Sequence, residues 1–215
     1  MPTVLGINAS PFVRKVRVAL AEKGVQYDLD PVIPVKVSDD FKKISPMGKV
    51  PAYRDGDKTL CDSSVICAYI EKVYPNPALY PSDPYDYARA LWFEEYGDAA
   101  LVQVFGPKIF FQRVIGPAFF QQKTDEAVVD KAINEEMPPL LTYLESQIGG
   151  DFIVGKQFSI GDIGLGSQFV NLQHAGVQVD AARWPKLAKY VAGILARPSF
   201  KALIDEESPQ FAGLR

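Results

Sequence analysis

The amino-acid sequence predicts a protein of two domains, an α/β domain over residues 1–76 and an all-helical domain over residues 85–215. In the first part, short apolar runs of strand length alternate with helical patterns, which is typical of α/β folds. After it, no convincing strand pattern occurs in the rest of the chain. Residues 77–84 are predicted to form a linker, because dense prolines prevent both helix and sheet formation. The prolines of this region are Pro75, Pro77, Pro81 and Pro84.

The α/β domain is predicted to begin with a strand, a helix and a second strand. Residues 2–8 form a short apolar run that reads as a buried strand. Ser10 and Pro11 follow as a capping residue with proline at the first helical position, and Gly24 marks the helix end. Residues 25–33 read as the second strand. A β-α-β order of this kind predicts parallel pairing of the two strands.

The rest of this domain is predicted to contain a hairpin followed by a helix. A short helix is expected over residues 39–44. An Asp-Gly-Asp turn separates two extended runs, over residues 50–54 and 58–61, which therefore form a hairpin. The segment from Ser63 to Val73 places apolar residues on one side of a helix.

Helical patterns run through the whole of the second domain. The two prolines at positions 138 and 139 are expected to bend or break one of its long helices, and Gly149 follows as an end signal. The predicted helices cover residues 84–113, 123–148, 159–173, 185–196 and 198–206.

Composition excludes several classes of function. The chain has 215 residues with a formal net charge of -3 and no basic block, so a nucleic-acid partner is not expected. No stretch approaches 18 consecutive apolar residues, so no membrane span is expected. The N-terminus lacks the regions of a signal peptide, and the predicted location is the cytoplasm.

Cysteine and histidine are too few for a disulfide framework or a metal site. The two cysteines, Cys61 and Cys67, lie in apolar surroundings and are predicted to be buried reduced thiols. The single histidine, His174, cannot build a multi-histidine zinc site, and it could serve in a Ser-His-Asp triad only by reaching a serine. We therefore expect no metal, and a structural or exposed role for His174.

Ser10 is the first candidate for chemistry, because it lies where the first strand leads into the first helix. A helix N-terminus presents free backbone N–H groups and a partial positive charge, and both stabilise an anion. A hydroxyl placed there can donate a hydrogen bond to a thiolate, and such surroundings lower the pKa of a thiol below its usual value of about 8.5. The alternative is that Ser10 only caps its helix.

Two further motifs could bind a peptide-like ligand. If the bond between Val50 and Pro51 is cis, the backbone groups of Val50 become available to a ligand; the alternative is a trans proline at a strand edge. Ser63 is predicted to be an N-cap whose N–H and hydroxyl could take a carboxylate, while Asp62 could pair with an amino group. By itself, this pair also reads as simple helix capping.

Taken together and in order, these motifs resemble the glutathione-site segments of the cytosolic glutathione transferases, of a serine-type and bacterial-like kind. A fourth segment resembles the capping box in the helical domain of that family. No tyrosine precedes Tyr27, which favours the serine type over classes that use tyrosine. The segments are SPFVRKVR at 10–17, SPMGKVP at 45–51, LCDSSVI at 60–66 and SIGDI at 159–163.

The resemblance implies a thioredoxin-like N-terminal domain followed by an all-helical C-terminal domain. It also implies that Ser10 hydrogen-bonds the sulfur of glutathione and is the catalytic residue. Val50 would precede a cis-proline, Pro51, and pair through its backbone with the cysteinyl part of the tripeptide. Asp62 and Ser63 would hold the γ-glutamyl end.

The glycine carboxylate of glutathione would be reached by Lys49 and Lys36. Glutathione is then a co-substrate, and no other cofactor is implied. Phe12, Tyr96 and Phe105 are predicted to line an apolar pocket for a small hydrophobic electrophile. The resemblance also implies a homodimer.

The sequence departs from the family pattern at two positions. Asp62 stands where the family usually has glutamate, one methylene longer, and can still pair with an amino group. Gly161 replaces the usual alanine of the capping box, where glycine costs a helix roughly 0.5–1 kcal/mol relative to alanine. A near match to a phosphate-binding loop at residues 150–157 is dismissed, because it follows a helix and ends in Gln157 in place of serine or threonine.

The predicted reaction is conjugation of the glutathione thiolate to the electrophile. Two alternatives remain open: glutathione-dependent isomerisation or dehalogenation at the same site, and a non-catalytic interaction module of the same fold.

Overall fold

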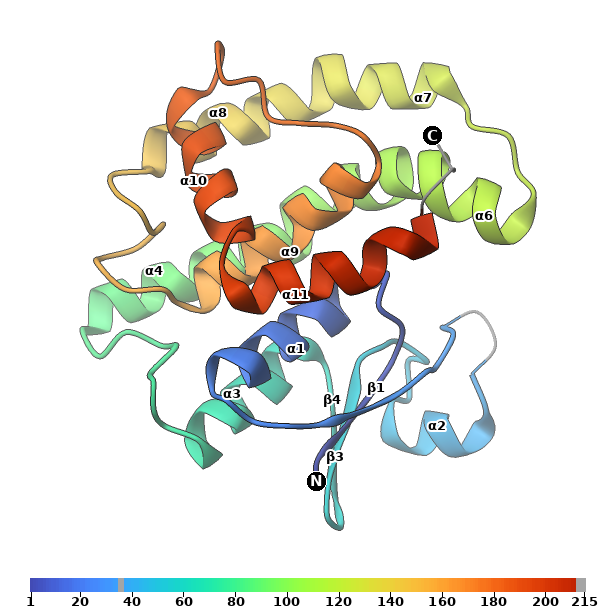
Figure 1. Ribbon diagram of the computed structural model, residues 1–215, viewed down its shortest axis with the longest axis vertical. Coiled ribbons are helices and arrows are strands. Elements are labelled where there is room, and N and C mark those ends of the chain that lie inside the picture. The colour runs from blue at the N-terminus through green and yellow to red at the C-terminus, as the bar shows by residue number, and fades with distance from the viewer. Residues whose placement is uncertain (35–36, 212–215) are drawn as a thin grey trace. The chain divides into compact units, whose positions relative to one another are not determined.

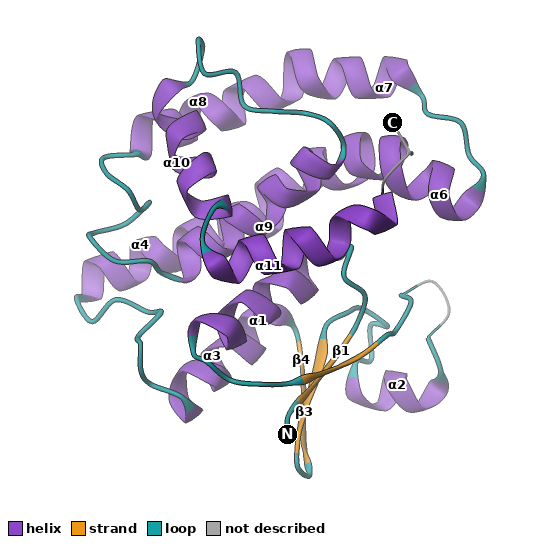
Figure 2. Ribbon diagram, in the orientation of Figure 1, coloured by secondary structure: helices purple, strands orange, loops and turns teal. Residues whose placement is uncertain are grey.

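The computed structural model describes residues 1–34 and 37–211, and it divides the chain into two compact units, Met1–Tyr80 and Pro81–Arg215 (Figure 1). The boundary between the units falls inside the segment 77–84 that the sequence predicts as a linker. Unit 1 contains strands and helices, whereas the described part of unit 2 is helical (Figure 2). The fold is therefore a thioredoxin-like unit followed by an all-helical unit, as predicted.

Unit 1 is built on a four-stranded sheet in the order β2-β1-β3-β4. Strand β1 pairs in parallel with β2, as the β-α-β order predicts, and β3 is antiparallel to both β1 and β4. The predicted hairpin is confirmed as the pair β3 and β4. The strands are β1 (Thr3–Leu5), β2 (Asp28–Asp30), β3 (Ala52–Asp55) and β4 (Lys58–Cys61).

The first two strands are shorter than the sequence predicts. The ladder with β2 stops at Leu5, so the predicted run over residues 2–8 is too long. Strand β2 was predicted over residues 25–33, but Pro31 follows Asp30 and has no N–H to donate to a sheet. The apolar pattern thus locates both strands without fixing their ends.

Three helices complete unit 1, and each begins at a polar side chain that accepts a backbone hydrogen bond. Ser10 caps α1 (Pro11–Glu22), Ser38 caps α2 (Asp39–Ile44), and Asp62 caps α3 (Ser63–Val73). Helices α2 and α3 have the predicted bounds. The prediction that Ser63 is an N-cap is wrong, because Asp62 occupies that position and Ser63 is the first helical residue.

The end of unit 1 is tied to its first helix by a buried lysine. The Lys23 ammonium contacts the Glu71 carboxylate of α3 and the Pro77 carbonyl oxygen, each at 2.5 Å. The same carboxylate accepts the backbone N–H of Leu79 at 3.1 Å. Prolines leave this segment without regular backbone pairing, so side-chain contacts hold it to the domain.

Unit 2 begins with a continuous helical run over residues 84–120, longer than the predicted 84–113. Much of it is wound as a π-helix, in which backbone bonds span five residues. Its segments are α4 (Pro84–Glu95), η1 (Tyr96–Leu101), α5 (Val102–Val104), η2 (Phe105–Ile115) and α6 (Gly116–Phe120).

The two adjacent prolines of unit 2 do not break their helix. Helical winding continues through α7 (Glu126–Lys131), η3 (Ala132–Glu136) and α8 (Met137–Gln147). The π-helical segment η3 directly precedes Pro138 and Pro139, which occupy the first turn of α8. A first turn tolerates residues without an N–H, so the expected break becomes a local change of winding.

The remaining helices agree with the sequence prediction within about one residue, and none of the described helices has the length and apolar character needed to span a membrane. His174, at the end of α9, is buried and its Nε2 lies 3.0 Å from a carboxylate oxygen of Glu207, which gives it a structural place. These elements are α9 (Ile160–His174), α10 (Pro185–Leu195), α11 (Pro198–Glu207) and η4 (Ser208–Phe211).

Helix α9 is almost entirely buried, and the predicted capping box at its start is present. The Asp162 carboxylate accepts hydrogen bonds from the backbone N–H groups of Ser159 and Ile153 and from the Tyr190 hydroxyl, each at 2.8 Å. Burial raises the pKa of Asp162 to about 6, although these hydrogen bonds act in the opposite direction. The box therefore joins α9, α10 and the loop before α9, which is a structural role.

Glycines let α9 approach its neighbours closely. A Cβ at Gly161 would lie 3.0 Å from the Ala90 carbonyl oxygen of α4, which explains why this chain lacks the alanine usual at that position. At Gly166 a Cβ would lie 2.7 Å from Phe200 of α11 and 2.8 Å from Ile194 of α10. Both of these side chains are buried, so neither has room to move aside.

Replacing Gly166 should therefore destabilise unit 2. We expect Gly166→Ala to lower the free energy of unfolding by about 1–2 kcal/mol, because overpacking outweighs the gain in helix propensity. Gly193→Ala in α10 is the matched control, since a Cβ there meets nothing within 4 Å. That variant should gain roughly 0.5–1 kcal/mol. Urea titrations of both variants measure the difference, and equal stabilisation by both would contradict the packing argument.

Candidate functional site

The register of the sheet in unit 1 brings three candidate segments to the same end of its strands, which we call the binding edge. Leu5 of β1 pairs with Ala52 of β3, which pairs in turn with Cys61 of β4. At this end of the sheet, strands β1 and β4 finish and the antiparallel strand β3 begins. Neighbouring strands lie about 4.8 Å apart. The starts of α1 and α3 and the segment before β3 are therefore neighbours, although the sequence separates them widely.

Ser10 is the N-cap of α1 and is half-buried. Its Oγ accepts the backbone N–H of Val13 at 3.4 Å, which is a long hydrogen bond. The capping role that the sequence left as an alternative is thus present. A hydroxyl that accepts one hydrogen bond still carries a hydrogen that it can donate, so capping and binding of a sulfur anion are compatible.

Val50 and Pro51 lie directly before β3, and the peptide bond between them is cis, as the resemblance implied. Both residues are buried. The sheet pairing of β3 starts at Ala52, so the backbone of Val50 lies outside the ladder. The loop before it is fixed by the Ser45 hydroxyl, which donates to the Lys49 carbonyl oxygen at 2.7 Å.

Asp62 combines a helix cap with an unusual backbone conformation. One carboxylate oxygen accepts the N–H groups of Ser64 and Val65, at 2.9 and 3.2 Å. Its φ of 75° and ψ of 128° lie in a region that residues other than glycine rarely adopt. Conformations of this kind cost of order 1–3 kcal/mol and concentrate at functional sites. The side chain is exposed at the sheet edge, next to the buried Ser63.

Lys49 and Lys36 are the two lysines predicted to reach the glycine carboxylate. Lys49 is exposed and directly precedes Val50 in the sequence. Lys36 lies outside the described residues. The assignment of both lysines to the ligand stays a prediction.

Basic residues of α1 that the sequence analysis did not assign a role are buried in the structure. Lys15 has no exposed surface, and its ammonium donates to the Ser64 hydroxyl of α3 at 2.9 Å. Arg17 donates to the Tyr27 hydroxyl at 2.7 Å and to the Asn8 side chain at 2.9 Å. The only advance signal was their position in the first quoted segment; the contacts themselves are tertiary.

The predicted electrophile residues of unit 2 lie in packed surroundings. Phe105 has no exposed surface and packs edge-on against Phe169, with ring centroids 5.6 Å apart. A side chain without exposed surface cannot touch a ligand unless its neighbours move. Tyr96 is nearly buried, donates to the Leu140 carbonyl oxygen at 3.2 Å and has its pKa raised to about 12 by burial. Phe12, in the first turn of α1, is half-buried.

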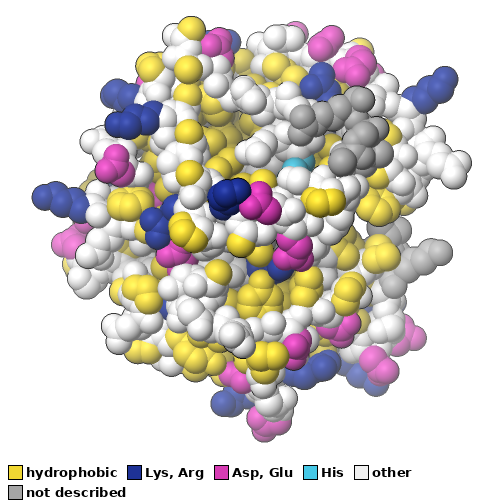
Figure 3. All heavy atoms as spheres, viewed as in Figure 1, with side chains coloured by type: hydrophobic (Ala, Val, Ile, Leu, Met, Phe, Trp, Pro, Cys, Tyr) yellow, Lys and Arg dark blue, Asp and Glu magenta, His cyan; other side chains and the backbone are white. Residues whose placement is uncertain are grey.

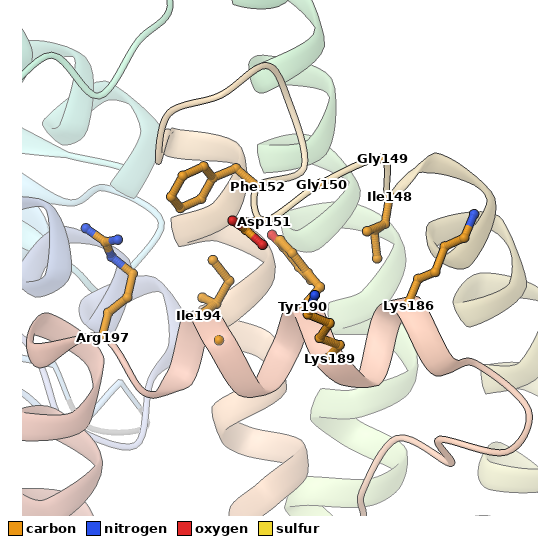
Figure 4. Close-up of a pocket in the computed structure, with 11 residues that line it drawn as sticks. Ile148, Gly149, Gly150, Asp151, Phe152, Lys186, Lys189, Tyr190, Ile194 and Arg197 are labelled. Atoms are coloured by element: carbon orange, nitrogen blue, oxygen red, sulfur yellow. The ribbon is translucent and has the colours of Figure 1, made fainter.

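A pocket of about 510 Å³ in unit 2 is lined by none of the predicted site residues. It lies between the loop over residues 148–152 and α10, and Figure 4 shows the side chains of this loop and helix around it. Its charged lining residues are Lys186, Lys189, Arg197 and Asp151. Part of its lining, residues 150–152, belongs to the segment that the sequence analysis dismissed as a phosphate-binding loop.

The remaining polar groups are the possible metal ligands, the two cysteines and the charged side chains of the surface. Among the described residues, no cluster of three or more His, Cys, Asp or Glu side chains could hold a metal ion. Cys67 is buried as predicted, but Cys61 is half-exposed because it ends the edge strand β4. On the face shown in Figure 3, basic and acidic side chains are interspersed.

A thioredoxin-like unit with a serine at its first helix start, a cis-proline and a capped acidic turn, followed by a helical unit, defines the class of glutathione-binding two-domain proteins. Comparison with known families agrees. The glutathione S-transferase N-terminal domain matches residues 4–78, and the C-terminal domain of that family matches residues 110–207. The chain belongs to the glutathione S-transferase family.

Individual relatives support this assignment over nearly the whole chain. Glutathione S-transferase U4 of Arabidopsis thaliana is 34% identical over 76% of this chain and 68% of that protein. A stringent starvation protein A homolog of Pasteurella multocida is 27% identical, covering 97% and 92%. The crystal structure of a glutathione S-transferase from Rhodospirillum rubrum superposes with a TM-score of 0.85 at 25% identity, covering 94% and 91%.

Asp62→Asn should separate capping from ligand binding. Asparagine caps helices as well as aspartate and tolerates positive φ, so we expect stability to stay within roughly 0.5 kcal/mol. If Asp62 pairs with the ammonium of glutathione, as the resemblance implies, the loss of its charge should weaken glutathione binding at least about fivefold. Calorimetric titration and urea unfolding measure the two quantities.

The matched control for this variant is Asp83→Asn. Asp83 caps α4 through the same pattern, accepting the N–H groups of Tyr85 and Asp86 at 2.9 Å each. It should leave glutathione affinity unchanged. If both variants weaken binding equally, Asp62 has no specific part in it.

Proposed function

We propose that this chain is a glutathione transferase that conjugates glutathione to a small hydrophobic electrophile. The observation that carries the proposal is the sheet register, which places Ser10, the Val50-Pro51 bond and Asp62 at one edge. A tripeptide that pairs with the backbone of Val50 then has the start of α3 at its γ-glutamyl end and the start of α1 beside its cysteinyl sulfur.

Each part of glutathione then has a partner of suitable chemistry. The γ-glutamyl ammonium pairs with Asp62, and its carboxylate takes the N–H and hydroxyl of Ser63 at the start of α3. The cysteinyl part pairs with the backbone of Val50. Lys49, together with Lys36, attracts the glycine carboxylate.

The reaction follows from stabilising the sulfur anion. The thiol loses its proton to solvent, and the thiolate is held by the Ser10 hydroxyl and by the N-terminus of α1. Its electron pair forms a carbon–sulfur bond, while the electrophile releases a leaving group or takes the electrons into an unsaturated bond. Catalysis comes from thiolate stabilisation and proximity, and no metal or other cofactor takes part.

The electrophile would occupy an apolar site beside the sulfur, and Phe12, half-buried in the first turn of α1, is the candidate that unit 1 supplies. The family suggests a homodimer, and we propose a cytoplasmic location. A substrate panel distinguishes conjugation from isomerisation and dehalogenation at the same site.

Ser10→Ala tests the mechanism. We expect turnover with a chloronitrobenzene substrate to fall about tenfold at neutral pH, and the pKa of the bound thiol to rise by about one unit. Affinity for glutathione should stay within a few-fold, because the peptide contacts remain. A pH profile of kcat/KM measures the shift, and unchanged turnover and pKa would remove Ser10 from the mechanism.

Ser38→Ala is the control for lost capping. Ser38 caps α2 by accepting the N–H of Phe41 at 3.1 Å, so this variant also loses a serine cap. Both substitutions should cost about 1 kcal/mol of stability, but only Ser10→Ala should change the pH profile.

A second candidate function is a non-catalytic interaction module, because the similar stringent starvation protein A homolog does not carry the name of a transferase. Retention on immobilised glutathione separates the two functions. We expect the wild-type chain to bind the resin and to elute with free glutathione, because Ser10, the cis Val50-Pro51 bond and Asp62 adjoin the same end of the sheet. Flow-through without retention would instead support the interaction module.

A further inference from the structure

The pocket of unit 2 lies apart from the residues assigned to glutathione. It has a volume of about 510 Å³ and is enclosed by the loop over residues 148–152 and one side of α10 (Figure 4). All of its lining residues belong to unit 2, so the pocket exists within that unit alone. Pockets of about 300–1,000 Å³ are typical of sites for small organic ligands.

The two walls of this pocket are fixed to each other through Asp162. The backbone N–H of Ile153, directly after the loop, and the Tyr190 hydroxyl of α10 both donate to the same oxygen of this buried carboxylate, at 2.8 Å each. Tyr190 itself lines the pocket. A cavity whose walls are held in place before a ligand arrives needs little further ordering on binding. The pocket is therefore a formed feature of unit 2.

Three glycines leave the pocket open. Gly149 and Gly150 belong to the loop wall, and Gly193 belongs to α10. A Cβ at any of these positions would meet nothing within 4 Å. Glycine destabilises a helix relative to alanine, and no close packing contact requires it at position 193, in contrast to Gly166. The space that Gly193 leaves is part of the pocket.

The lining combines an apolar wall with two exposed lysines. Ile148 and Ile194 are buried, and the ring of Phe152 is half-buried. Lys186 and Lys189 lie three residues apart on α10, which places them on the same side of the helix. Within the described ranges, neither ammonium forms an ion pair. The pocket thus offers an apolar surface next to two cations that are available to a ligand.

The charges around the pocket favour an anion. Among the described residues that line it, Asp151 is the only acid, and its side chain is exposed. Arg197 also lines the pocket, but its guanidinium lies over the Phe158 ring, 3.9 Å from the centroid, and has further contacts. Without Arg197, two lysines stand against one carboxylate. Because these charges are exposed to water, they should change affinity by a few-fold and no more.

We propose that this pocket binds a small aromatic anion, a flat apolar body that carries one carboxylate, sulfonate or phosphate group. The body lies beside Gly193 against the apolar wall, and Lys186 and Lys189 hold the anionic group. The pocket contains none of the residues assigned to glutathione, so this ligand binds independently of the proposed reaction.

The first test compares three probes that share a naphthalene ring and differ in charge. They are 2-naphthalenesulfonate, the neutral 2-naphthalenemethanol and the cation 2-naphthylmethylammonium. Calorimetric titrations are run with saturating S-hexylglutathione present, so that the proposed transferase site is filled. We expect the sulfonate to bind at least about fivefold more tightly than the alcohol, and the ammonium to bind most weakly.

The second test fills the pocket from α10. Gly193→Leu places an apolar side chain in the open space and should weaken sulfonate binding at least about tenfold. Ala192→Leu is the matched control, because Ala192 is the exposed neighbour on the same helix and does not line the pocket. It should keep the affinity within about twofold. Circular dichroism checks that both variants fold.

The third test changes the charges of the lining. The double variant Lys186→Gln with Lys189→Gln should weaken sulfonate binding about fivefold and leave the alcohol unaffected, whereas Asp151→Asn should strengthen sulfonate binding about twofold. Lys123→Gln with Lys131→Gln makes the same change in net charge at exposed positions outside the pocket, and it should have no effect.

The proposal is overturned if the wild-type chain does not bind the sulfonate, or binds the alcohol or the ammonium as tightly. It is also overturned if Gly193→Leu binds the sulfonate like wild type, or if the two lysine pairs have equal effects. Preference for the ammonium, lost in Asp151→Asn, would assign the pocket to a cation instead. If Gly193→Leu does not fold, the exposed lysine pairs decide the question.

Discussion

The alignment of Leu5, Ala52 and Cys61 across three strands is the constraint on which the site depends. Because β1 and β4 point the same way, both deliver a helix start to one edge, and the antiparallel β3 delivers the cis-proline segment to that edge. A slip of one residue in any strand would turn its side chains to the other face and separate these segments. The hydrophobic side chains that fix the register therefore also fix the geometry of the binding edge.

Stability and binding make opposite demands at this edge. Asp62 holds a backbone conformation that is costly for a residue with a side chain. Under the proposed function, pairing of Asp62 with the ammonium of the ligand accounts for this cost. The capping bonds of Ser10 and Asp62 keep the two helix starts ordered before the ligand arrives, so less order has to be gained on binding.

The sequence alone located most of the fold because the signals were local. The helices predicted over residues 39–44 and 63–73 have the bounds of α2 and α3, and the boundary between the units falls within the proline-rich segment. What it missed depended on tertiary context. The choice of Asp62 over Ser63 as cap, the contact between Lys15 and Ser64, and the burial of Phe105 against Phe169 arise from residues far apart in sequence. The two prolines of α8 show that local rules also fail where a helix can change its winding.

The glycines of α9 limit how this chain can diversify. Where main chains touch main chains, as at Gly161 and Gly164 against α4, no side chain can be exchanged to reshape the surroundings. Substitutions that change the helical unit are therefore expected on its outer helical turns and connecting loops, while the buried helix α9 stays unchanged. Variant libraries that are screened for new electrophilic substrates should therefore vary those outer positions.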